Sequence, residues 1–300
     1  MKTKNKVLTS STGSKILIHL VLGLMALLCV LPLIFVLSIS FSDEIDITRN
    51  GYAVFPRVFS LEAYRMILKD PQQLLTSYSV TIFVSVCGSL LALTISSMIG
   101  YVLTRSDFKA AKAITFLIFF PLMFQAGLVP FYIFVVRVLH LKDTLTILII
   151  PYLIIPWLVL LLKGFMTQIP RSVIESGWID GASEIRIFFK IIAPMSKSAL
   201  ATVGLFYLLA YWNDWWLSLL FISSTAKMPL QLLLQRILSN AEFLRSSMFQ
   251  SSGTAIDLAK LPGETARMAT ALLVAGPILV IFPFFQRFLV KGIAVGSIKG

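Results

Sequence analysis

Residues 71–104 read PQQLLTSYSVTIFVSVCGSLLALTISSMIGYVLT, a stretch that contains no Asp, Glu, Lys or Arg. About 20 apolar residues, each rising about 1.5 Å, are enough for a helix to cross the hydrocarbon core of a bilayer. The stretch is therefore long enough to span a membrane. The whole chain fits this class, because 57% of its 300 residues are hydrophobic and 13% are charged. A soluble domain carries about 25% charged residues.

Four further segments are also apolar runs without charged residues, and a fifth, 198–226, is interrupted only by Asp214. We therefore expect an all-α polytopic membrane protein with six transmembrane helices. The expected spans are about 16–42, 74–104, 113–136, 144–162, 198–226 and 268–287. They define a transmembrane domain over 16–290, between an N-terminal tail, 1–15, and a C-terminal tail, 291–300. The first apolar segment is much longer than the roughly 7–15 apolar residues of a signal peptide, so we expect it to remain as a span.

The positions of Lys and Arg indicate the orientation of the chain. If the N-terminus is cytoplasmic, the inner segments hold 15 of the 26 basic residues and four acidic residues. Positively charged loops favour the cytoplasmic side, so we expect both termini to lie there. The basic residues form short patches beside apolar segments, which argues against a nucleic-acid-binding face.

This orientation assigns the longer connecting segments to the two sides of the membrane. The segment 163–197 would be cytoplasmic, and the segments 43–70 and 227–266 would be external. Apolar spacing predicts a helix over 229–244, and the polar composition of 246–254 predicts a turn. Both cysteines fall within apolar runs and belong to no CxxC pair or Cys/His cluster, so we expect neither a disulfide nor a metal site.

The inner segment contains the sequence ESGWIDGASEIRIFFKIIAP, residues 175–194. Trp178, Ala182, Ile185 and Phe189 recur at helical spacing and predict one apolar face. Asp180-Gly181 favours a turn, and we expect Pro170 to begin a first helix and Pro194 to end a second. The pattern alone supports two interpretations, an element that transmits force to a partner or an interfacial helix that anchors the loop.

The spacing of these residues resembles the EAA signature of ABC importer permeases, E-A-A-x-x-D-G-A followed by F, I and P. In that family the loop is a coupling helix that docks on the cytoplasmic ATPase. Ser176 and Gly177 stand where the family usually has alanines, and Ser198 stands where a second proline is common. The resemblance implies an ATPase-coupling site formed by Glu175, Ser176, Gly177, Trp178, Asp180, Gly181, Ala182, Phe188, Ile191 and Pro194.

The resemblance extends over the whole chain. The six spans, the element Trp212-Asn213-Asp214 and the ending Phe285 to Gly300 are similar to bacterial carbohydrate-uptake permeases of the MalG/LplC-like group. This implies the type I permease fold, a multi-pass location in the bacterial cell membrane and an oligosaccharide substrate. It also implies three partners: a homologous second permease in a heterodimer, two copies of an ABC ATPase, and an extracytoplasmic sugar-binding protein.

A second candidate site lies within the fifth expected span. Asp214 is ionisable, and such a residue inside a span costs several kcal/mol unless it is paired or faces water. Aromatic rings and amide or carboxylate groups suit sugar rings. The site would line the substrate pathway, join neighbouring helices or subunits, or form an interfacial aromatic belt. Its residues are Trp212, Asn213, Asp214, Trp215 and Trp216.

The sequence contains no glycine-rich phosphate loop of the Walker type, so ATP and Mg²⁺ would be bound by a partner ATPase. We expect a non-catalytic transport subunit that binds no metal or cofactor. Three alternatives stay open: an ABC permease for a non-sugar solute, a stand-alone secondary transporter or channel, and an intramembrane enzyme. The enzyme would require a cluster of acid/base or metal-binding residues, whereas Asp214 is the one charged residue deep in any expected span.

Overall fold

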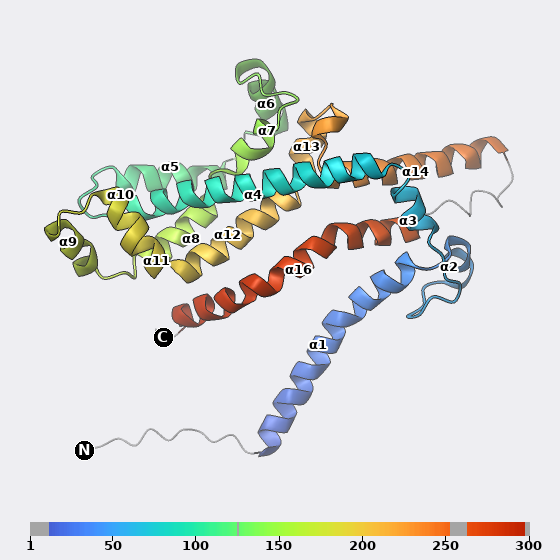
Figure 1. Ribbon diagram of the computed structural model, residues 1–300, viewed down its shortest axis with the longest axis horizontal. Helices are drawn as coiled ribbons and strands as arrows, with labels where there is room; N and C mark the ends of the chain where they lie inside the picture. Colours follow the sequence, from blue (N-terminus) through green and yellow to red (C-terminus); the bar gives the residue numbers. More distant parts are fainter. Residues whose placement is uncertain (1–11, 125, 253–262, 298–300) are drawn as a thin grey trace. The chain divides into compact units, whose positions relative to one another are not determined.

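The computed structural model describes residues 12–124, 126–252 and 263–297, and its regular secondary structure in these ranges is helical (Figure 1). An isolated antiparallel bridge joins Ser42 and Phe59. The expected all-α class is therefore confirmed. The chain divides into two compact units, which are described separately: Met1–Lys69 with Ile237–Ala275, and Asp70–Arg236 with Gly276–Gly300.

Three helices in the described ranges are long and apolar enough to cross a membrane without a break. They are α1 (Thr12–Ser40), α4 (Pro71–Val102) and α16 (Glu264–Ser297). These helices correspond to the first, second and sixth expected spans. Helix α16 continues to Ser297, so most of the expected tail 291–300 is helical; residues 298–300, like residues 1–11 of the N-terminal tail, lie outside the described ranges.

The other three expected spans are not continuous helices. The third consists of α5 (Ala111–Met123), α6 (Leu128–Ile133) and the π-helix η1 (Phe134–Val138). The fourth consists of α7 (Thr146–Ile149), the 3-10 helix η2 (Ile150–Tyr152) and α8 (Pro156–Met166). The fifth consists of α12 (Lys197–Trp212) and α13 (Trp216–Phe221). The described residues reach six candidate spans when each bent pair of helices counts as one; for the fifth span the counted pair is Glu184–Met195 with Lys197–Phe221.

The break in the fourth span has a local cause. Segments Thr146–Tyr152 and Pro156–Met166 meet at 49°. Ile155 takes an extended backbone conformation, φ −89° and ψ 112°, because the ring of the following proline disfavours helical geometry at that position. Pro156 then starts α8, a position where the backbone N–H has no partner within the helix, so the lack of an N–H in proline costs no hydrogen bond.

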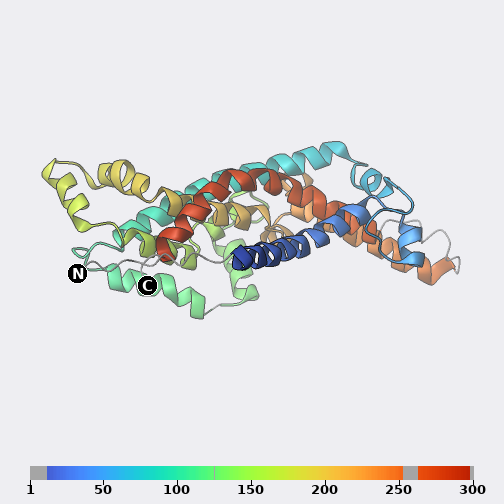
Figure 2. The same cartoon turned by 90° about the horizontal axis from the view of Figure 1, so that it is seen from below.

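Helix α4 is the centre of the unit Asp70–Arg236 with Gly276–Gly300, and packs chiefly against α12 and α8 (Figures 1 and 2). Its buried face consists largely of small residues, which let the helix backbones approach closely. A Cβ added at Gly88 would lie 2.7 Å from Cζ of Tyr211, and one added at Gly100 would lie 3.1 Å from Cβ of Leu162. The small buried residues of α4 are Ser77, Ser85, Gly88, Ser89, Ala92, Ser96, Ser97 and Gly100.

We expect Gly88→Ala to destabilise the protein. Alanine favours a helix over glycine by about 1 kcal/mol, but overpacking a close contact costs about 1–3 kcal/mol. The Tyr211 ring cannot move aside freely, because it is buried and its hydroxyl donates a 2.8 Å hydrogen bond to the Ile149 carbonyl. The thermal unfolding midpoint in detergent should fall. Gly164→Ala is the control, since nothing lies within 4 Å of its added Cβ; an equal shift in both variants would contradict the packing argument.

In the other unit, a buried carboxylate joins the two expected outer segments. Glu44 begins α2 (Glu44–Asn50), which is followed along the chain by α3 (Glu62–Ile67). The Glu44 carboxylate is 3.0 Å from the backbone nitrogens of Glu264 and Thr265, and 2.7 Å from Oγ1 of Thr265. It therefore satisfies free N–H groups at the start of α16.

Helix α14 (Leu230–Ser252) confirms the helix expected over 229–244 and corrects the turn expected over 246–254. The helix continues as far as Ser252, and residues 253 and 254 lie outside the described ranges. Polar composition was a poor guide here, because the backbone hydrogen bonds in the interior of a helix form whatever the polarity of its side chains.

Candidate functional site

The expected helix–turn–helix of the inner segment is present over residues 171–195, near the C-terminal end of α4 (Figure 2). Helix α9 (Arg171–Ile179) follows Pro170, and a turn at 180–182 leads to α10 (Glu184–Ile187). Gly181 has φ +71°, a left-handed conformation that glycine adopts without steric cost. The Ser183 hydroxyl then accepts from the Arg186 N–H and starts α10. The dipeptide Asp180-Gly181 therefore forms the turn that its sequence predicts.

The second helical run ends at Met195, one residue after Pro194, which agrees with the predicted end. After α10 the chain forms the π-helix η3 (Phe188–Ile192) and then α11 (Ala193–Met195), so Pro194 lies in the last turn of the run. The π-turn shifts the hydrogen bonds to the carbonyl five residues back, as in the bond from the Ala193 N–H to the Phe188 carbonyl. A proline is tolerated where the regular ladder is already interrupted. The chain bends by 89° after Met195, where α12 begins.

The predicted apolar face of the segment is wrong. Ile185 and Phe189 are exposed, whereas Ile187 and Phe188 are buried. The turn at 180–182 resets the direction of the helix, so residues on its two sides do not share one face. Ile179, with 87% of its surface exposed, is the most exposed large apolar residue of the segment.

Gly177 explains one departure from the EAA pattern. It is buried in α9, and a Cβ added there would lie 3.1 Å from Cγ1 of Ile187 and 3.4 Å from Cδ1 of Ile191. The two helices of the segment therefore pack against each other at Gly177. An alanine at this position would force its neighbours to shift slightly.

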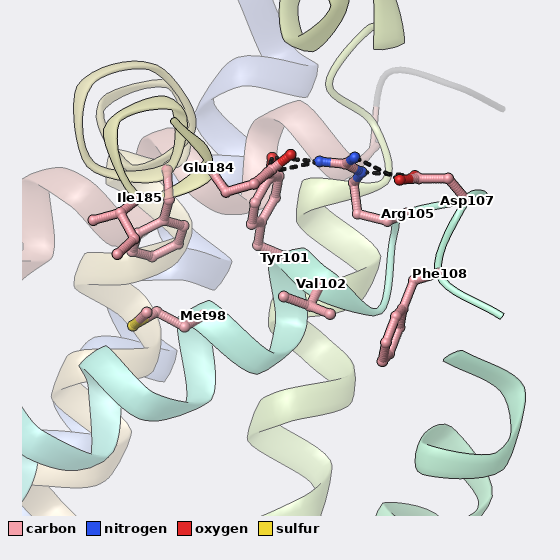
Figure 3. A pocket seen from close by; sticks show the side chains of 9 residues that line it. Met98, Tyr101, Val102, Arg105, Asp107, Phe108, Glu184 and Ile185 are labelled. Atoms are coloured by element: carbon pink, nitrogen blue, oxygen red, sulfur yellow. Dashed lines mark hydrogen bonds and ion pairs between the residues drawn. The ribbon is translucent and has the colours of Figure 1, made fainter. Parts of the chain in front are cut away.

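An unexpected polar cluster fixes the segment to the end of α4, and we call it the Arg105 clasp. Its members are Tyr101, Arg105, Asp107, Trp178 and Glu184. Arg105 donates to Asp107 through Nε and Nη2, at 2.9 and 2.8 Å, and to Glu184 Oε2 through Nη1, at 2.7 Å. Figure 3 shows the guanidinium group between the two carboxylates.

The carboxylate of Glu184 collects donors from three parts of the chain. Oε2 accepts from Arg105 and, at 3.0 Å, from the Tyr101 hydroxyl; Oε1 accepts from Nε1 of Trp178 at 2.9 Å. The Arg105 guanidinium also stacks on the Trp178 ring, 4.3 Å from its centroid. Hydrogen bonds from Arg105 hold the pKa of Asp107 below its ordinary value, and those with Asp107 raise the pKa of Arg105. Both groups are therefore charged at neutral pH.

The clasp borders a cavity of about 300 Å³ (Figure 3). Its walls are mostly apolar, and the charged groups of the clasp supply its polar part. The lining residues are Met98, Tyr101, Val102, Arg105, Asp107, Phe108, Glu184, Ile185 and Phe188.

Glu175, the first residue of the EAA-like pattern, is connected through Arg171 to Ser106, in the loop that follows α4. Its carboxylate forms a 2.9 Å ion pair with Nε of Arg171, and Nη1 of Arg171 donates a hydrogen bond to the Ser106 hydroxyl. The Glu175 side chain remains about half exposed, so it is accessible to a partner.

The second candidate site lies where the fifth span breaks, at residues 213–215 between α12 and α13. Trp212 is buried, with 4% of its surface exposed, whereas Trp215 and Trp216 are each 43% exposed. The Trp215 and Trp216 rings meet edge to face with centroids 5.8 Å apart. Asn213 is exposed, and its amide donates to the Leu209 carbonyl. The structure therefore separates the candidate residues into buried and accessible groups.

Asp214 joins this break to the break in the fourth span. Its Oδ1 accepts from the Tyr152 hydroxyl at 2.9 Å and from the Leu217 N–H at 3.3 Å. Two further tyrosines supply partners for backbone groups freed near the fourth-span break: the Tyr207 hydroxyl accepts from the Ile155 N–H at 3.2 Å, and the Tyr211 hydroxyl donates to the Ile149 carbonyl. Freed backbone groups inside a membrane require such partners.

Sequence reasoning missed the Arg105 clasp and the tyrosines that support the breaks. In the sequence, Arg105 served only as one of the basic residues that indicate the orientation of the chain. The tyrosines lie in apolar segments, where tyrosine is common and gives no signal of a specific role. The one signal for the clasp was Arg105 and Asp107 standing two residues apart beside a span. Among the described residues, no three His, Cys, Asp or Glu side chains are placed to hold a metal ion.

Comparison with known proteins supplies the family. A family model described as "Binding-protein-dependent transport system inner membrane component" matches residues 92–295. Protein LplC of Bacillus subtilis (strain 168) is 34% identical over 281 residues, which cover 94% of this chain and 93% of LplC. The polygalacturonan/rhamnogalacturonan transport system permease protein YtcP of the same organism is 35% identical over 285 residues, covering 95% and 97%.

The fold comparison agrees. A chain in the crystal structure of a bacterial ABC transporter involved in the import of the acidic polysaccharide alginate superposes with a TM-score of 0.74 and 25% sequence identity. The match covers 91% of this chain and 95% of that chain.

Proposed function

Because the chain belongs to the family of binding-protein-dependent transport system inner membrane components, we propose that it is the permease subunit of an ABC importer for oligosaccharides. The observation that carries the proposal is the near full-length similarity to YtcP, whose name specifies polygalacturonan and rhamnogalacturonan transport. The alginate importer, with its acidic polysaccharide, supports the same substrate class. We therefore place acidic oligosaccharides first among the candidate substrates.

The permease forms half of the translocation pathway, and a homologous second permease forms the other half. Two copies of a cytoplasmic ATPase bind ATP and Mg²⁺ and hydrolyse ATP, since this chain has no phosphate-binding loop of the Walker type. The chain itself is a non-catalytic transport subunit in the bacterial cell membrane, surrounded by lipid, with both termini in the cytoplasm. Its positively charged inner segments support that orientation.

The cytoplasmic loop 163–197 couples the permease to the ATPase. Ile179 and Ile185 present exposed apolar side chains, and Glu175 presents a half-exposed carboxylate. These groups offer an apolar contact flanked by a polar one, which is the composition of a protein–protein contact. Phe188 has a different role, because it is only 3% exposed and packs in the chain's own core, next to Tyr101. Phe188 and Ile191 thus shape the loop from inside.

The sugar passes the break between α12 and α13. Trp215 and Trp216 expose aromatic faces, and Asn213 exposes an amide, the groups that bind a sugar ring by stacking and hydrogen bonding. Trp212 and Asp214 hold the break in shape. The outer segments 43–70 and 227–266 receive the binding protein, and the hydrogen bonds that Thr265 donates to Glu44 link the start of the first segment to the end of the second.

The test is transport by the purified complex. The chain carries an affinity tag and is co-expressed with its partner permease, ATPase and binding protein, and the complex is reconstituted into liposomes. We expect the ATPase to co-purify and oligogalacturonides to accumulate in an ATP-dependent manner, with alginate oligosaccharides and maltodextrins as competitors. Full transport activity by this chain alone would identify a secondary transporter and overturn the proposal. A neutral sugar as the preferred substrate would overturn only the acidic class.

A further inference from the structure

We propose that Arg105 is the positioning residue that holds the 171–195 segment to α4, so that movement of the segment by the ATPase is passed to the transmembrane core. The inference rests on the proposed coupling function of this segment. It concerns a residue outside the EAA-like pattern, in the loop that follows α4.

Arg105 is rigidly attached to α4. The last turn of the helix continues into hydrogen bonds from the Thr104 N–H to the Tyr101 carbonyl, 3.0 Å, and from the Arg105 N–H to the Val102 carbonyl, 3.1 Å. The Arg105 side chain is only 11% exposed. A displacement of its guanidinium group therefore acts on the end of α4 and not on a slack loop.

Asp107 sets the orientation of this guanidinium group. It accepts two hydrogen bonds from Nε and Nη2, a bidentate pairing that fixes the plane of the group. Nη1 is left pointing at Glu184 and at the hydroxyl of Tyr101, 3.1 Å away (Figure 3). A lysine at this position could not reproduce the arrangement, because its ammonium group lacks the planar fork.

Arg105 contacts both helices of the 171–195 segment. It binds Glu184, the first residue of α10, and stacks on Trp178 in the last turn of α9. These residues lie on opposite sides of the turn at Gly181, and Nε1 of Trp178 donates to Glu184 across it. One guanidinium group thus holds α9 and α10 together and ties both to α4.

Helix α4 is well placed to pass on the displacement. It packs against α12, which ends at the break carrying Asn213, and against α8, which begins at the break after Ile155. Contiguous packing of this kind carries energetic coupling between distant sites. The clasp is the point at which the 171–195 segment enters that packing.

The experiment uses the reconstituted complex and measures sugar uptake and ATP hydrolysis in the same liposomes, with oligogalacturonide as the probe. For Arg105→Gln we expect uptake per ATP hydrolysed to fall about fivefold or more, the lower end of typical coupling effects. Arg105→Lys should give an intermediate ratio. Glu184→Ala should resemble Arg105→Gln, and the double variant should be no worse than the more severe single one, because both remove the same contact.

Lys109→Gln is the matched control. Lys109 lies in the same loop after α4 as Arg105, but it is exposed and is not a member of the clasp. Removal of its positive charge should leave uptake per ATP at the wild-type value. Because the ratio is measured on assembled complex, a variant that merely lowers the yield does not change it.

The outcome also separates the inference from the function on which it rests, through the variant Ile179→Asp. If Ile179→Asp prevents ATPase binding or uptake while Arg105→Gln retains the wild-type ratio, the positioning role of Arg105 is wrong and the coupling role of the segment stands. If both variants transport like the wild type, the coupling role itself is wrong.

Discussion

Replacing Gly181 with valine is expected to lower sugar uptake per ATP hydrolysed about tenfold. Gly181 has φ +71°, a region that costs an L-residue roughly 1–2 kcal/mol, and a β-branched residue is the least suited to it. Nothing lies within 4 Å of the added Cβ, so the Cβ itself meets no neighbour and the penalty expected here is that of the backbone conformation. A penalty of about 1.4 kcal/mol on the docked shape of the turn lowers the equilibrium constant for that shape about tenfold.

The measurement is the ratio of uptake to ATP hydrolysis in liposomes, with Gly181→Asn as the control. Asparagine enters the left-handed region more readily than other non-glycine residues, so this variant should keep most of the coupling. Membrane insertion should be the same for both variants, since the turn lies outside the spans. Equal ratios for valine, asparagine and wild type would show that the geometry of the turn does not matter for coupling.

Local features of the fold were well predicted from the sequence. Runs without charged residues predicted α1, α4 and α16, because the length of a continuous span depends only on the apolar run. The turn at Gly181 was also predicted, because its backbone conformation is a preference of the dipeptide itself. The resemblance to the EAA signature favoured a coupling role for the 171–195 segment, which its pattern alone left undecided and which stays a prediction.

Features that depend on distant contacts were not predicted. Glu184 and Arg105 are separated by 79 residues, and Tyr152 and Asp214 by 62, so neither pair shows in any local pattern. The apolar face of the segment failed for a related reason: a helical period was counted through a turn that ends the helix. The prediction of continuous helical spans was wrong where prolines, or side chains that form hydrogen bonds with the backbone, interrupt the apolar runs. Apolar composition predicts membrane insertion but not where a helix breaks.

Asp214→Leu is expected to have the largest effect on stability. The carboxylate accepts from the Tyr152 hydroxyl at 2.9 Å, from the Leu217 N–H at 3.3 Å and from the Ser218 hydroxyl at 3.5 Å. Each donor left without a partner inside the protein costs about 1–3 kcal/mol. Losing two or three of them removes a large share of the roughly 5–15 kcal/mol that stabilises a folded domain. The thermal unfolding midpoint in detergent should fall sharply, and little complex should be recovered.

Asp214→Asn separates a structural role from contact with the sugar. The amide oxygen can still accept from Tyr152 and Leu217, so we expect the thermal midpoint and the KM for uptake to stay near the wild-type values. Trp216→Ala should show the opposite pattern, a raised KM with an unchanged midpoint, because Trp216 is accessible and Asp214 is engaged within the chain. A raised KM in a thermally stable Asp214→Asn variant would instead place the carboxylate in the sugar path. Trp215, Trp216 and Asp214 would then all lie in the sugar path, and Asp214 would also join the break in the fourth span to the break in the fifth.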